Sequence, residues 1–129
     1  MLKTGILNPR VLDLISRVRH TNTIVIADRG FPFWRQIETV DISLVDDVPT
    51  VLQVLHALRG SCTFGKAWMA KEFFRANDKR TQASFVAALK GASVKFEPHG
   101  DFKKRVTNAI GLIRTGDTTQ YGNIVLESA

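Results

Sequence analysis

The stretch that decides the fold runs from Arg17 to Pro32, R-V-R-H-T-N-T-I-V-I-A-D-R-G-F-P. Its middle, Thr23 to Ala27, is apolar and rich in β-branched residues, which is typical of a buried strand. His20 precedes this strand, and Asp28 follows it and leads into a turn. At roughly 3.3 Å per residue, an extended chain separates His20 from Asp28 by about 26 Å. The two side chains can therefore share a site only if a second copy supplies one of them, or if the segment before the strand folds back.

The composition is that of one ordinary globular domain. The chain has 129 residues, of which 44% are hydrophobic and 23% charged, so we expect a single domain over residues 1–129. No apolar run approaches the roughly 18 residues of a membrane span, and no secretory signal is evident. Cys62 is the only cysteine, which excludes a disulfide within the chain and favours a cytoplasmic location.

The net charge of +6 is spread along the chain instead of being gathered in a patch or tail. A nucleic-acid-binding protein concentrates its basic residues, so we expect no nucleic-acid partner. A solvated basic surface, or attraction for an anionic ligand, explains the charge.

Helical and strand patterns alternate along the remaining sequence. Because strands that alternate with helices indicate a layered fold, we expect an α/β protein, a single α/β/α domain with a mostly parallel sheet. Residues 63–74 fit either a strand with a helical extension or one longer strand. Helices are expected from Asn8 to about Arg19, from Asp46 or Asp47 to Gly60, over 81–90 and from Asp101 to about Asn108, and strands at 23–27, 40–44, 93–97, 109–113 and 123–126.

An aromatic loop, formed by Phe31, Phe33 and Trp34, follows the first strand. Aromatic side chains this dense can form a lid over a ligand, contact another subunit, or simply pack beneath the loop. The sequence leaves these three interpretations open.

Motifs for metals, nucleotides and covalent catalysis are absent from the sequence. We therefore expect neither a metal nor a cofactor. Ligands of α/β proteins collect beyond the carboxyl ends of strands, where Asp28, His99 and Arg114 fall and His20 does not. Residues that suit a small polyhydroxyl ligand and proton transfer remain in the expected loops: His20, Asp28, His99, Lys103, Tyr121 and Asn123.

Over nearly its whole length, the chain resembles the D-ribose pyranase and L-fucose mutarotase family. The resemblance lies in the order and spacing of several short motifs: Lys3-Thr4-Gly5-Ile6-Leu7-Asn8, His20-Thr21-Asn22, Ile24 to Asp28 with Gly30 and Pro32, Val40-Asp41-x-Ser43-Leu44, His99-x-x-Phe102-Lys103, Ile113-Arg114-Thr115-Gly116 and Tyr121-Gly122-Asn123-Ile124.

The resemblance implies a cofactor-free isomerase that interconverts ring forms or anomers of a monosaccharide by acid–base catalysis. It implies that His20 is catalytic. It also implies a homo-oligomer, commonly a ring decamer, with each site shared between neighbouring subunits. The expected substrate-binding residues are Asp28, His99, Lys103, Tyr121, Gly122 and Asn123.

The sugar is left open by the sequence. His99 resembles the ribose branch of the family, whereas Tyr121-Gly122-Asn123 is closer to the fucose type. We favour a ribose pyranase, with an L-fucose-type mutarotase or a non-catalytic monosaccharide-binding protein as alternatives. We also expect His99 to lie just before the helix that starts at Asp101, where the helix dipole would lower its pKa.

Overall fold

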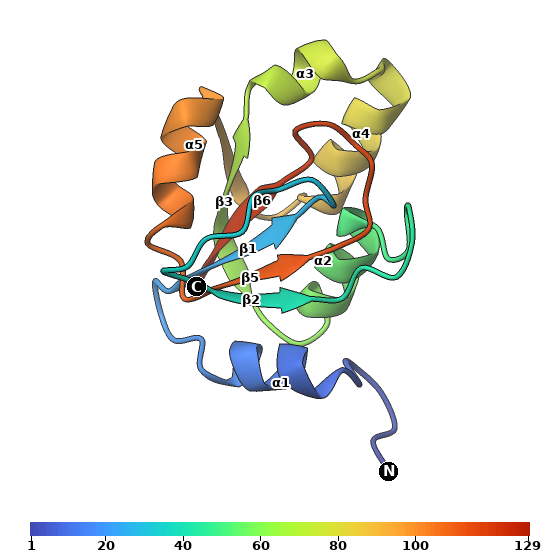
Figure 1. Cartoon of the computed structure of the whole chain (residues 1–129), viewed down its shortest axis with the longest axis vertical. Helices are drawn as coiled ribbons and strands as arrows, with labels where there is room; N and C mark the ends of the chain where they lie inside the picture. The colour runs from blue at the N-terminus through green and yellow to red at the C-terminus, as the bar shows by residue number, and fades with distance from the viewer.

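A six-stranded sheet with the order β2-β5-β1-β6-β3-β4 forms the middle layer of the molecule (Figure 1). The computed structural model describes all residues, 1–129. Strand β6 runs antiparallel to its neighbours β1 and β3, and the other pairings are parallel. This confirms the expected mostly parallel sheet. The strands are β1 (Thr23–Ala27), β2 (Glu38–Asp41), β3 (Phe64–Ala70), β4 (Ser93–Glu97), β5 (Gly111–Arg114) and β6 (Ile124–Ser128).

Helices cover both faces of this sheet, as Figure 1 shows. Ile24 and Ile26 of β1 point to the face covered by α1, α2 and α4, while Val25 and Ala27 point to the face covered by α5. All four are fully buried, which explains why β1 reads as one continuous apolar run. The layered α/β/α class is therefore confirmed. The helices are α1 (Pro9–Ser16), α2 (Val51–Arg59), α3 (Glu72–Ala76), α4 (Lys79–Ala88) and α5 (His99–Val106). None of them is long and apolar enough to cross a membrane.

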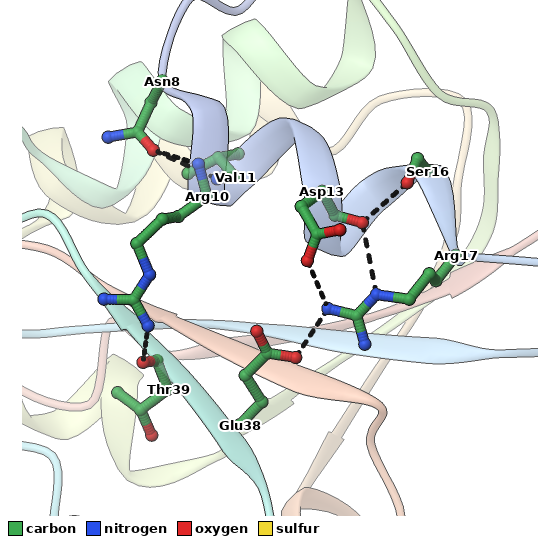
Figure 2. A network of polar contacts seen from close by, with 8 residues as sticks. All are labelled: Asn8, Arg10, Val11, Asp13, Ser16, Arg17, Glu38 and Thr39. Carbon is green, nitrogen blue, oxygen red and sulfur yellow. Dashed lines mark hydrogen bonds and ion pairs between the residues drawn. The ribbon is translucent and has the colours of Figure 1, made fainter.

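Helix α1 begins as predicted but ends early. The Asn8 side chain accepts hydrogen bonds from the first backbone N–H groups of the helix, and Arg17 reaches both Asp13 and Glu38 of β2 (Figure 2). These ion pairs are exposed and contribute little stability. The predicted end near Arg19 was wrong: the N–H groups of Arg17 and Val18 bond three residues back, which closes the helix at Ser16.

Helix α2 is capped by Thr50, and not by Asp46 or Asp47 as expected. Thr50 and Gln53 form a reciprocal capping box. Asp47 instead has a left-handed backbone, with φ of 62°, and its carboxylate accepts hydrogen bonds from Thr118.

Strand β2 starts two residues and ends three residues earlier than predicted, because its partner β5 ends at Arg114, opposite Asp41. Beyond that pair, the N–H and hydroxyl of Ser43 both donate to the Asp41 carboxylate and turn the chain away. Residues 63–74 form strand β3 followed by the short helix α3, the first of the two alternatives.

The boundaries of four other elements also differ from the prediction. Helix α4 starts at Lys79 instead of 81, since Asp78 accepts from the Thr81 N–H and caps it. Strand β5 starts at Gly111 instead of 109, and β6 spans 124–128 instead of 123–126. Helix α5 begins at His99 instead of Asp101, which makes His99 its first residue rather than a loop residue.

Candidate functional site

A polar hollow of about 320 Å³ opens beyond the carboxyl ends of β1 and β4. Because β6 is antiparallel, its first residues reach the same edge of the sheet. The volume is near the lower end of the roughly 300–1,000 Å³ of small-molecule sites. Only two of the nine lining residues are hydrophobic, so the hollow suits a small polar ligand. The lining residues are Asp28, Gly30, Phe31, Pro32, His99, Lys103, Gln120, Tyr121 and Asn123.

Asp28 and Asn123 hold each other through two hydrogen bonds. The Asp28 N–H donates to Asn123 Oδ1 over 2.7 Å, and Asn123 Nδ2 donates to Asp28 Oδ2 over 3.2 Å. The Gly30 N–H donates to the other carboxylate oxygen. Burial nevertheless raises the pKa of Asp28 above its ordinary value, against the opposing effect of these hydrogen bonds. The pair thus presents a fixed carboxylate that can accept from hydroxyl groups.

Tyr121 is held at the hollow in a left-handed backbone conformation, with φ of 55°. Such a conformation is costly for a residue other than glycine and persists where the surroundings impose it. The loop before Tyr121 is tied down by Asp117, a buried residue whose carboxylate accepts from the N–H groups of Val51 and Thr119. The position of Tyr121 therefore depends on a contact with the start of α2.

His99 lies between two aromatic rings. Its ring stacks on Phe102 with centroids 6.1 Å apart, and it meets Tyr121 edge-on at 5.1 Å. Its pKa is lowered mainly by burial and then by the charge of Lys103, while Glu72 and Asp28 act in the opposite direction. The expected direction is confirmed, but burial and a neighbouring cation cause the shift. The imidazole is therefore neutral near pH 7.

Lys103 lines the hollow four residues after His99, on the same face of α5. It takes part in none of the seven salt bridges of the chain. Its ammonium group is thus available to a ligand in the hollow.

His20 lies at the opposite end of β1 from this hollow. The strand is five residues long, which corresponds to about 17 Å at the usual rise. The segment before the strand does not fold back: the N–H of Thr21 bonds to Ser128 at the far end of β6. The His20 side chain is exposed and makes no hydrogen bond within the chain. One copy of the chain therefore does not bring His20 together with Asp28.

Gly122 also does not line the hollow. It is buried beneath the loop, where an added Cβ would lie 3.2 Å from both Phe85 and Thr119. Its missing side chain lets Phe85 and Thr119 pack closely against the backbone here. Its two neighbours, Tyr121 and Asn123, do face the hollow.

Sequence patterns did not point to three residues at or near the hollow: Gln120, Glu72 and Asp117. Gln120 lines the hollow, and Glu72 Oε2 accepts from the His99 N–H over 2.8 Å. Gln120 directly precedes the motif at Tyr121, and this closeness was a usable signal. Nothing in the sequence connects Glu72 with His99, which is 27 residues away.

The aromatic loop is divided between packing and exposure. Phe31 is only 4% exposed, packs edge-on against Phe102 and lines the hollow, and Trp34 stacks on Phe31. Phe33 is 68% exposed. Packing beneath the loop therefore accounts for Phe31 and Trp34, while Phe33 faces solvent.

Residues 1–129, the whole chain, match the model of a family described as the RbsD / FucU transport protein family. The D-ribose pyranase of Geobacillus kaustophilus is 38% identical over 128 residues, which cover 99% of this chain and 93% of that protein. The D-ribose pyranase of Geobacillus thermodenitrificans is 34% identical, over 99% of this chain and 96% of that protein.

Solved structures agree with this match. The structure of Bacillus subtilis RbsD complexed with D-ribose has a TM-score of 0.93 at 28% identity, covering 100% of this chain and 98% of that chain. The fucose mutarotase from Streptococcus pneumoniae, in complex with L-fucose, has a TM-score of 0.83 at 18% identity over 99% of this chain and 98% of that one. The second likeness shows the shared fold alone.

Proposed function

Because this chain belongs to the RbsD / FucU transport protein family, we propose that it is a sugar isomerase of the D-ribose pyranase kind. It would interconvert the pyranose and furanose forms of ribose without a cofactor. The observation that carries the proposal is the polar hollow, in which a carboxylate with raised pKa faces a histidine with lowered pKa. Pairs of titratable groups whose pKa values are shifted in opposite directions are typical of acid–base sites.

The chemistry requires two proton transfers. In the pyranose, a base removes the proton of the anomeric hydroxyl while the bond between C1 and the ring oxygen breaks, and an acid protonates that oxygen. The products are the C1 aldehyde and a free hydroxyl. Closure through a different hydroxyl onto C1, with the proton transfers reversed, gives the furanose. Positioned acid–base groups accelerate such steps by about 10²–10⁴-fold.

The residues of the hollow can supply one half of this chemistry. The neutral imidazole of His99 can accept the proton of the anomeric hydroxyl. Asp28, held by Asn123, accepts from a sugar hydroxyl, and Lys103 donates to one. Tyr121 presents an aromatic ring and a phenolic hydroxyl at the rim.

We assign the second proton transfer to His20 of another copy of the chain, in a homo-oligomer whose sites are shared between subunits. Two observations support this assignment. His20 is exposed and has no hydrogen-bond partner, and it lies at the amino end of β1, far from the hollow of the same copy. In addition, the loop of residues 44–48 carries three exposed apolar side chains, Leu44, Val45 and Val48, which are 77%, 62% and 46% exposed. An apolar patch of this kind is often covered by another subunit. The ring of ten subunits and the cytoplasmic location remain part of this proposal.

Exchange NMR on D-ribose tests the function directly. The rate of exchange between pyranose and furanose signals should rise in proportion to the concentration of protein. L-Fucose is the matched comparison: faster exchange between its anomers, without an effect on ribose, would favour the mutarotase alternative. Binding of ribose without faster exchange would identify a non-catalytic sugar-binding protein and overturn the proposal.

A further inference from the structure

Glu72 makes a contact that the proposed reaction does not use. It is the first residue of α3, and one residue separates it from the carboxyl end of β3. Its Oε2 accepts from the His99 N–H over 2.8 Å. Pro98, at the N-cap of α5, provides no side-chain cap. Glu72 therefore caps α5 from a neighbouring element, and this much is a structural role.

The second oxygen of Glu72 and one nitrogen of His99 are left over from this contact. Glu72 Oε1 is buried and has no hydrogen-bond partner, and the same is true of His99 Nδ1. A carboxylate oxygen can only accept a hydrogen bond, whereas Nδ1 of a neutral imidazole donates in one tautomer and accepts in the other. Buried polar atoms without partners are costly, so two such atoms on residues already joined by a hydrogen bond call for a common explanation.

We propose that Glu72 is a positioning residue that fixes the tautomer of His99. One water molecule joins the two atoms: it donates to Oε1 and accepts from Nδ1–H. The proton of the neutral imidazole is then on Nδ1, and the lone pair is on Nε2. Nε2 is not buried and has no partner within the chain, and His99 lines the hollow. His99 would thus meet the sugar as a hydrogen-bond acceptor and base, and not as a donor.

The charges around His99 are consistent with this arrangement. Lys103 on the same helix opposes protonation of the ring, while Glu72 from α3 and Asp28 from the end of β1 favour it. Tyr121 meets the ring edge-on from the loop before β6. Because the negative charge of Glu72 favours protonation of the ring, it would also make Nε2 more basic.

The variant Glu72→Gln separates capping from control of the tautomer. The glutamine carbonyl can keep the hydrogen bond to the His99 N–H, so α5 stays capped. Its NH₂ group, which only donates, then takes the place of Oε1 and donates to the water molecule, so that the water donates to Nδ1. The expected result is that Nδ1 becomes the acceptor and the ring proton moves to Nε2. Glu38→Gln on the exposed side of β2 removes an equal charge elsewhere and is the matched control.

The measurement is a long-range ¹H–¹⁵N correlation spectrum of protein labelled on histidine, above pH 7.5. The chain has only three histidines, so His99 is assigned by comparison with His99→Gln. We expect protonated Nδ1 in the wild type and in Glu38→Gln, and protonated Nε2 in Glu72→Gln. Protonated Nε2 in the wild type, or one tautomer shared by all three proteins, would overturn the proposal. If Glu72→Gln fails to fold, the wild-type spectrum alone decides.

The catalytic consequence rests on the proposed function, but the tautomer does not. In Glu72→Gln we expect kcat for ribose exchange to fall about a hundredfold, the low end of what a positioned base contributes. The limb of the pH profile that reports His99 should move to lower pH, because a favourable negative charge is lost. A wild type without activity would remove the proposed function and leave the spectral result to stand or fall by itself.

Discussion

At the carboxyl end of β1, the Asp28 carboxylate accepts hydrogen bonds from Gly30 and Asn123, whereas at the amino end the His20 ring is exposed and has none. At the carboxyl end, Asp28 and Asn123 are paired, and the pKa values of Asp28 and His99 are shifted from their ordinary values. The second end has no partner within the chain. In the proposed mechanism, one copy of this protein therefore builds the sugar-binding site but not a complete catalytic site.

The strongest test of this comparison mixes two inactive variants. His20→Ala and Asp28→Ala should each lower the rate of ribose exchange by about a hundred- to ten-thousandfold. If sites are shared between copies, unfolding the two variants together and refolding them restores part of the activity, because some sites then combine a native His20 with a native Asp28. Exchange NMR measures the rates.

His56→Ala serves as the control for this experiment, because His56 is an exposed histidine on α2, away from the hollow. It should keep full activity. A mixture as inactive as its components, although both are folded, would show that the two ends of β1 do not meet between subunits.

A second test weakens the pairing of Asp28 with Asn123 at the carboxyl end of β1. Asn123→Asp keeps the acceptor for the Asp28 N–H but replaces the donor to the Asp28 carboxylate by a second carboxylate. Asn123 is only 3% exposed, so we expect a loss of about 1–3 kcal/mol in the free energy of unfolding at pH 8. The loss should shrink toward pH 5, because two adjacent carboxyl groups take up a proton more readily.

The matched variant is Asn22→Asp, at the amino end of β1. Asn22 Oδ1 accepts from the Arg19 N–H, and an aspartate oxygen preserves that hydrogen bond. Its effect should remain within about 0.5 kcal/mol in urea unfolding. Equal losses for the two variants would contradict the contrast between the ends.

The smallest expected effect concerns the pH dependence of stability. The pKa of His99 is lower in the folded protein than the ordinary value of about 6.5 in an unfolded chain. The unfolded state therefore binds the proton more tightly, and His99 destabilises the fold as pH falls below about 6.5. Thermal unfolding from pH 7.5 to 5 should show a steeper loss for the wild type than for His99→Gln. Parallel curves would mean that His99 titrates alike in both states.

Local patterns were enough to predict most of the fold. The apolar run of β1 and the Asn8-Pro9 start of α1 were predicted correctly, because their causes lie within a few residues of sequence. The carboxyl end of β2 and the start of α5 were not predicted correctly. The first depends on where the partner strand β5 stops, and the second depends on Glu72 supplying a cap from a different element.

The site follows the same rule. Five residues that were predicted from motifs do line one hollow: Asp28, His99, Lys103, Tyr121 and Asn123. Gly122 does not, because adjacent residues in a loop need not face the same way. Glu72 and Asp117 escaped notice because their partners are 27 and 66 residues away. Contacts of that kind come from the fold and leave no local pattern.

The central place of β6 has a consequence for how the protein is made. This strand is the last of the six along the chain, yet it lies between β1 and β3 and joins the two halves of the sheet. While the chain leaves the ribosome, neither half has its partner, and Asn123 has not yet reached Asp28. Pairings between distant segments form slowly, so completion of the sheet should be the late step in folding. The Asp28–Asn123 pair of the candidate site and a continuous core therefore arise in the same event, so a chain that has only begun to fold carries neither.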